Sequence, residues 1–78
     1  MVDVPTKSLR YHARQRMAER NISDEAIDWV LANYHTRRPA PVRDPAEPVE
    51  ILQGTFNGRD IKVYVVSGSN PPIVKTVA

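Results

Sequence analysis

The sequence contains no cysteine, and its 78 residues include only three glycines, one tryptophan and one phenylalanine. Without cysteine, a disulfide framework, a thiolate metal site and a cysteine nucleophile are all excluded. A chain this short has room for one domain with a small core. We therefore expect a single domain over residues 1–78 that depends on close packing or on a partner for its stability.

Long apolar runs are also missing. The first ten residues, MVDVPTKSLR, lack the apolar run of a signal peptide. No stretch approaches the roughly 20 apolar residues that span a bilayer. We therefore expect a cytoplasmic protein with no membrane partner. The formal net charge of +2 is too small to indicate nucleic acid by itself.

The basic residues are unevenly distributed along the chain. Residues 6–18 carry four basic side chains and no acidic one, whereas acidic residues gather soon after position 23. Three further arginines, Arg37, Arg38 and Arg43, lie in the mid-chain segment HTRRPAPVR. We interpret these three as solvated loop charges, with contacts to an RNA backbone as the alternative.

Two helices are predicted in the first half of the chain. In residues 6–20, apolar side chains recur every four positions, at Leu9, Ala13 and Met17, so they share one helix face. Asn21 fits a left-handed C-cap, and Ser23 fits the N-cap of a second helix over about residues 24–34. The buried face of that helix is expected to consist of Ala26, Ile27, Val30, Leu31 and Tyr34.

The second half is predicted to form a sheet. VEILQGTF and RDIKVYVV flank Asn57-Gly58, the pair typical of a two-residue hairpin turn. Together with IVKTVA, they predict a three-stranded antiparallel meander over 49–56, 60–67 and 73–78. The proline-rich residues 35–48 are predicted to be an extended, semi-rigid crossover. The expected fold is α+β in the order ααβββ, with the helices packed on one face of the meander.

The first predicted helix carries a histidine and two arginines close to its apolar side. At about 100° per residue from the first apolar position, His12 lies near 300°, Arg16 near 340° and Arg20 near 20°. Arg10 and Arg14 lie farther round, at roughly 100° and 140°, so we expect them at the solvent edge.

Two interpretations of this row are open. In the structural one, the arginine stems lie along apolar surface, Arg16 pairs with Glu19 or Asp24, and His12 bonds a backbone carbonyl. In the functional one, the row holds a phosphodiester, because guanidinium donors match phosphate oxygens and imidazole exchanges a proton near neutral pH. RNA cleavage by the neighbouring 2′-hydroxyl needs a base, an acid and a cationic cradle, but no metal or cofactor. No metal-ligand spacing is present.

The segment HARQRMAERNIS, from His12 to Ser23, resembles the signature of a family of small bacterial domains of unknown function. That signature is His-Ala-x-x-Arg-Met-x-x-Arg, followed by a turn and a second helix opened by serine. IVKTVA resembles the family's closing strand, so the resemblance spans about Tyr11 to Val77. The family is similar in fold order to the RelE-like toxins and barnase, which are small α+β ribonucleases.

This resemblance implies roles for individual residues. His12 would transfer protons, Arg16 and Arg20 would hold the scissile phosphate, and Thr76 would complete the catalytic set from the last strand. An antitoxin protein would cover the basic face.

The predicted sheet supplies further candidates. If Ile61, Val63 and Val65 face the core, strand alternation places Lys62 and Tyr64 on the open face, where they would bind substrate together with Lys75. Of the other aromatic residues, Trp29 is expected in core or edge packing and Tyr11 at the surface.

Three functions follow from these patterns. The first is a metal-independent ribonuclease of the toxin type that cleaves RNA phosphodiester bonds. The second is a non-catalytic module that binds RNA or a protein with the same face. The third is a purely structural domain in which Arg16 and Arg20 pair with internal carboxylates.

Overall fold

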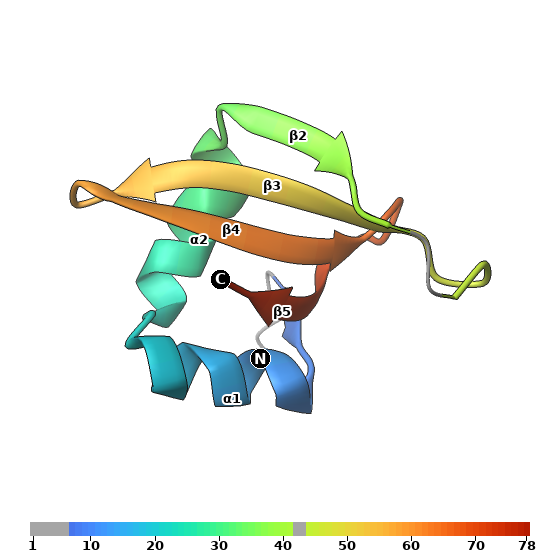
Figure 1. The fold of residues 1–78 in the computed structure, drawn as a ribbon, viewed down its shortest axis with the longest axis horizontal. Coiled ribbons are helices and arrows are strands. Elements are labelled where there is room, and N and C mark those ends of the chain that lie inside the picture. Colours follow the sequence, from blue (N-terminus) through green and yellow to red (C-terminus); the bar gives the residue numbers. More distant parts are fainter. Residues whose placement is uncertain (1–6, 42–43) are drawn as a thin grey trace, which may run out of the picture.

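The computed structural model describes residues 7–41 and 44–78, which form two helices and a five-stranded mixed sheet (Figure 1). The helices are α1 (Tyr11–Arg20) and α2 (Asp24–Asn33). The sheet order is β1-β5-β4-β3-β2. Its strands are β1 (Ser8–Leu9), β2 (Thr36–Pro39), β3 (Val49–Phe56), β4 (Arg59–Val66) and β5 (Ile73–Val77). The α+β class and the three central strands are as predicted. The predicted three-stranded antiparallel meander was wrong as the whole sheet, because β1 and β2 add a strand at each edge.

The start of the chain corrects the first predicted helix. Leu9 belongs to β1, which pairs in parallel with β5, and α1 begins only at Tyr11. The backbone N–H of Ser8 donates to the Pro72 carbonyl at 2.8 Å, and that of Arg10 donates to Val74 at 3.1 Å. These bonds to a distant strand hold the backbone extended where the local apolar spacing suggested a helix. Thr6, the first residue of the predicted helix, lies outside the described residues.

The proline-rich connection also contains a strand that was not predicted. β2 pairs antiparallel with β3 from Thr36 to Pro39, so Arg37 and Arg38 lie on an edge strand and not in a loop. Both arginines are exposed, as expected, but Arg37 also pairs with Glu50 at 2.9 Å. Pro39, which lacks a donor, stands at the end of this edge, where a missing N–H disturbs pairing least. Arg43 lies outside the described residues.

The local signals for turns and caps are confirmed. Asn57 and Gly58 both have positive φ, 52° and 77°, as the two-residue turn between β3 and β4 requires. Asn21 adopts the left-handed conformation (φ 56°, ψ 47°) at the end of α1. At the start of α2, Ser23 Oγ accepts a hydrogen bond from the Ala26 N–H at 3.1 Å.

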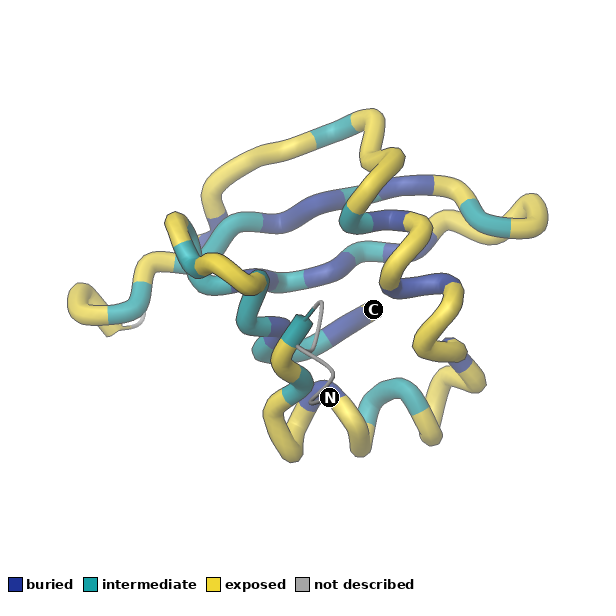
Figure 2. The backbone as a smooth tube through the Cα atoms, turned by 180° about the vertical axis from the view of Figure 1, so that it is seen from behind, coloured by how far each residue is buried: buried dark blue, intermediate teal, exposed yellow. Residues whose placement is uncertain are grey.

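The core lies between the sheet and the two helices (Figures 1 and 2). α2 lies behind β3 and β4, and α1 runs beside β5. α2 packs closely, because a Cβ on Gly54 of β3 would lie 3.4 Å from a Val30 methyl group. As predicted, alternate residues of β4 point inward. The fully buried side chains include Ile27, Val30, Ile61, Val63, Val74 and Val77.

Trp29 lies at an edge of the core, one of the two predicted places, whereas Tyr34 lies nearer the surface than predicted. Trp29 is 46% exposed and packs at the sheet margin, where its Nε1–H donates to the Thr55 carbonyl at 2.9 Å. Its ring lies 6.1 Å from that of Phe56, centroid to centroid. Tyr34, expected on the buried face, follows the last residue of α2 and is 39% exposed. Neither described helix is long enough to cross a membrane.

Candidate functional site

A groove of about 1040 Å³ lies between α1 and the sheet face opposite α2. Its walls come from α1, from the connection between β2 and β3, and from β4 and β5. Six of the seven residues predicted from the sequence line it: His12, Arg16, Arg20, Tyr64, Lys75 and Thr76. Lys62 precedes Tyr64 by two residues in β4, so it lies nearer the hairpin turn, and it does not line the groove. The structure thus brings the two groups of predicted residues together across one groove.

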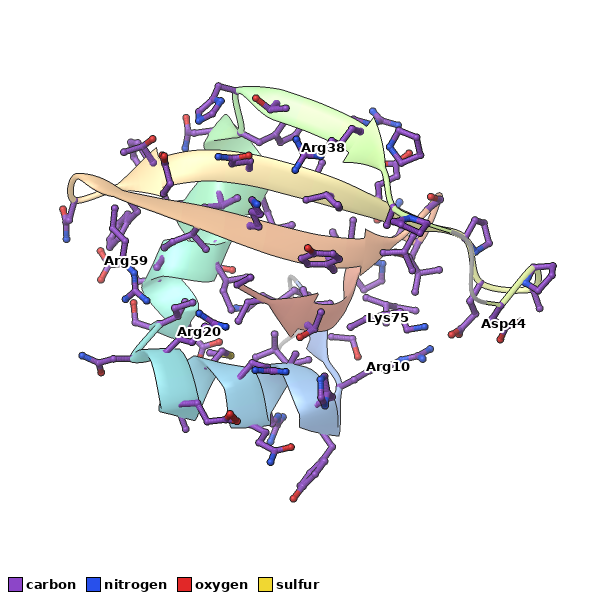
Figure 3. All side chains as sticks on the ribbon, in the orientation of Figure 1. Arg10, Arg20, Arg38, Asp44, Arg59 and Lys75 are labelled. Atoms are coloured by element: carbon purple, nitrogen blue, oxygen red, sulfur yellow. The ribbon has the colours of Figure 1, made fainter. Side chains whose placement is uncertain are left out.

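The α1 side of the groove follows the predicted helical angles. Ala13 is fully buried, whereas His12 and Arg20 are exposed and Arg16 is half-buried. The buried alanine turns the row of His12, Arg16 and Arg20 toward the sheet margin. Figure 3 shows Arg20 extending from the last turn of α1 toward the sheet. Tyr11 is 82% exposed, as predicted for a surface residue, and stands at the rim.

The arginines of this row are only weakly neutralised. Arg16 Nη1 lies 3.9 Å from Glu19 Oε1, a loose pair of the exposed kind that contributes little. Asp24, the other predicted partner of Arg16, instead lies 3.3 Å from Lys7 Nζ. Within residues 7–41 and 44–78, no carboxylate forms an ion pair with Arg20. Arg20 therefore presents an uncompensated positive charge to the groove among the described residues.

The sheet side of the groove is shaped by a β-bulge in β5. Tyr64 pairs with Thr76, but the next residue of β4, Val65, pairs with Val74. One residue of β5, Lys75, is therefore extra, and a bulge of this kind changes the direction of the side chains around it. As a result, the consecutive residues Lys75 and Thr76 both line the groove beside Tyr64.

Sequence reasoning missed a carboxylate at one end of the groove. Glu47, in the connection between β2 and β3, accepts two hydrogen bonds from Arg10: 2.9 Å from Nη1 to Oε1 and 2.6 Å from Nη2 to Oε2. Lys75 Nζ lies 3.3 Å from Glu47 Oε1. Figure 3 shows Arg10 and Lys75 extending side by side in the same direction. The hydrogen bonds from Arg10 and then from Lys75 lower the pKa of Glu47 to about 2.

Arg10 therefore occupies a different place from the one predicted. It is exposed, as expected, but it precedes α1 instead of lying in the first helix, and it lines the groove. Its partner lies 37 residues away in the chain, so no local pattern could have paired the two.

A second missed contribution comes from Arg59 at the start of β4. Its guanidinium donates to the Arg20 carbonyl at 2.6 Å and to the Asn21 carbonyl at 3.2 Å. The last carbonyls of a helix have no partners within the helix, and a cation there also suits the helix dipole. Arg59 thereby fixes the turn of α1 that carries Arg20.

The described residues contain no cluster of three or more histidine or acidic side chains that could hold a metal ion.

Comparison with known proteins gives one match. The profile of a family described as Domain of unknown function (DUF4258) matches residues 9–78, nearly the whole chain. No curated protein and no solved structure matches. The match carries no link to RelE-like toxins or to barnase. It does cover both the His-Ala-x-x-Arg-Met-x-x-Arg segment and the closing strand, so the chain belongs to the DUF4258 family.

Proposed function

We propose that this domain is a metal-independent endoribonuclease of the toxin type, with its site in the groove between α1 and the sheet. One observation carries the proposal: the predicted proton-transfer residue, His12, and the predicted phosphate ligands, Arg16 and Arg20, line the same groove as Tyr64, Lys75 and Thr76. The fold order, helices followed by an antiparallel hairpin, is shared with RelE-like toxins and adds support only by analogy.

The reaction would be attack of an RNA 2′-hydroxyl on the adjacent phosphorus, which forms a 2′,3′-cyclic phosphate and breaks the bond from phosphorus to the 5′-oxygen. The departing 5′-oxygen would take a proton from water. His12 would accept the 2′-hydroxyl proton, since imidazole can exchange protons near neutral pH. Arg16 and Arg20 would stabilise the charge that develops on the phosphate oxygens. Thr76 would bond the substrate from β5. The exposed position of His12 allows a substrate to reach it.

A second candidate function is a non-catalytic module that binds RNA in the same groove. It is favoured by the fact that His12 is the single histidine lining the groove in the described part of the chain. Two proton transfers are needed for cleavage, and one imidazole supplies only one of them at a time. In either case, an antitoxin or other acidic protein that covers the groove would block it.

The test compares His12→Ala with His35→Ala. His35, the only other histidine, is exposed and immediately precedes β2, and its Nδ1 lies 2.8 Å from Thr36 Oγ1. Cleavage of RNA should fall by about 10²- to 10⁴-fold in His12→Ala. RNA binding should be retained in this variant, and cleavage should be normal in His35→Ala. In cells, the wild type should arrest growth and fragment RNA, and His12→Ala should relieve both effects.

A second pair of variants tests the phosphate ligands. Arg20→Ala should weaken binding of single-stranded RNA and reduce the slope of log K against log salt by about 0.7, the value for one lost phosphate contact. Arg14→Ala is the control, because Arg14 is exposed on α1 but does not line the groove. A wild type that binds RNA without cleaving it supports the binding module. A wild type that neither binds nor cleaves RNA refutes both functions.

A further inference from the structure

At the end of the groove nearest the start of α1, two cationic side chains hold an anion, the carboxylate of Glu47. A guanidinium fork takes both oxygens of the Glu47 carboxylate, and the Lys75 ammonium approaches one of them. Arg10 precedes α1, Lys75 lies in the β5 bulge, and Glu47 comes from the connection before β3. The same fork and ammonium would suit two oxygens of a phosphate, which binds arginine in the same bidentate way.

We propose that Arg10 and Lys75 form a second phosphate subsite, which the Glu47 carboxylate occupies until a nucleic-acid phosphate displaces it. This inference rests on the proposed function and specifies its substrate class: a single strand with at least two phosphates. Arg10 precedes α1 and its guanidinium contacts Glu47, whereas Arg16 lies within α1 and pairs loosely with Glu19. The two guanidinium groups thus contact different carboxylates, so we expect the two ends of the groove to hold different phosphates of one strand.

The exchange is favoured by the charge of the groove. Among the described residues, four permanently cationic side chains line it, Arg10, Arg16, Arg20 and Lys75, against two acidic side chains, Asp44 and Glu47. The Glu47 side chain is 30% exposed and its Arg10 partner 41%, so water screens the pair. A strand that already contacts Arg16 and Arg20 brings its next phosphate to this end at a high effective concentration.

The connection that carries Glu47 has hydrogen bonds that do not involve the ion pair. The Ala46 N–H donates to Asp44 Oδ1 at 3.0 Å, and the Glu47 N–H donates to the Asp44 carbonyl at 3.0 Å. This turn holds the backbone whether or not the Glu47 carboxylate is engaged. The side chain can therefore leave Arg10 and Lys75 without unfolding the segment.

The experiment uses Glu47→Gln, with Glu50→Gln as the matched control. Glu50 also pairs with an arginine, Arg37, at 2.9 Å, but outside the groove. The probe is a fluorescent tetranucleotide of 2′-O-methyl RNA, which cannot be cleaved through its 2′-oxygen. Its dissociation constant is measured by anisotropy over a range of salt concentrations.

Glu47→Gln should bind the probe about three- to tenfold more tightly than the wild type at low salt. The slope of log K against log salt should steepen by about 0.7 to 1.4, because one or two cations now release counterions on binding. Adding Lys75→Gln to Glu47→Gln should remove part of that gain. Glu50→Gln should bind like the wild type.

Binding that is unchanged or weaker in Glu47→Gln, with an unaltered salt slope and a normal circular dichroism spectrum, overturns the subsite and leaves Glu47 as a clamp. Failure of every protein to bind the probe overturns it as well. If Glu47→Gln is unfolded, the Arg10→Gln variant replaces it, and wild-type-like affinity and slope in Arg10→Gln overturn the subsite. Cleavage is scored separately: tighter binding by Glu47→Gln with no cleavage by the wild type refutes the ribonuclease but supports the subsite.

Discussion

Replacing Arg59 with methionine should destabilise the domain through the end of α1. The aliphatic stem is largely retained, but two hydrogen bonds to the Arg20 and Asn21 carbonyls are lost. A hydrogen bond contributes about 0.5–1.5 kcal/mol net, and a cation at a helix C-terminus about 0.3–1 kcal/mol. Since these groups are exposed, we expect the lower part of that range, about 1–2 kcal/mol in all. For a domain of this size, each kcal/mol lowers Tm by about 4–8 °C.

The measurement is urea denaturation followed by circular dichroism, with thermal melting as a second reading. Arg38→Met is the control, because Arg38 is exposed on β2 and forms no ion pair with a described residue. Amide hydrogen exchange should also accelerate in the last turn of α1, at Glu19 and Arg20, more than in β3. A free energy of unfolding within about 0.3 kcal/mol of the control, with unchanged exchange in α1, would show that Arg59 does not cap the helix.

Two further predictions concern Glu47 and Ser23. The pKa of Glu47 is about 2 in the folded protein against an ordinary value of 4.5, so its ion pairs with Arg10 and Lys75 stabilise the fold above about pH 5. That contribution should be lost as pH falls from about 5 to 2, and Glu47→Gln should flatten this part of the unfolding profile; parallel profiles for the two proteins would contradict it. Ser23→Ala should lower the free energy of unfolding by about 1 kcal/mol, because the Ala26 N–H loses its acceptor. Ser23→Asp should restore most of that loss in urea melts.

The features that were predictable from the sequence are set by neighbouring residues. Asn21, Ser23 and the Asn57-Gly58 turn each depend on a few residues of backbone geometry. The predicted alignment of His12, Arg16 and Arg20 on one side of the helix also holds, although the predicted start of that helix was wrong. Its angles relative to Ala13 and Met17 hold within α1, whichever residue begins the helix.

The features that were missed are set by distant residues. β1 has two residues, and its partner Ile73 lies 65 positions beyond Ser8. Leu9 matches the helical spacing, but the backbone N–H groups of its neighbours donate to Pro72, just before β5, and to Val74 in β5. Arg10 was assigned a helical angle although it precedes the helix, and its contact with Glu47, 37 residues away, has no local signal. β2 was hidden because arginine and proline are poor indicators of a strand.

The bulge in β5 lets this strand contribute side chains both to the core and to the groove. Val74 and Val77 are both buried although three positions separate them, a spacing that a regular strand would place on opposite faces. If Lys75 were absent, Val74, Thr76 and Val77 would be consecutive and would face the core, the groove and the core in turn. Each would keep its observed partner in β4. Lys75 therefore adds no side chain to the core, and it interrupts the β4–β5 ladder. What it contributes is an ammonium group 3.3 Å from Glu47 Oε1, the oxygen that also accepts from Arg10. The core alone does not require Lys75, whereas the phosphate subsite that we propose at this end of the groove does.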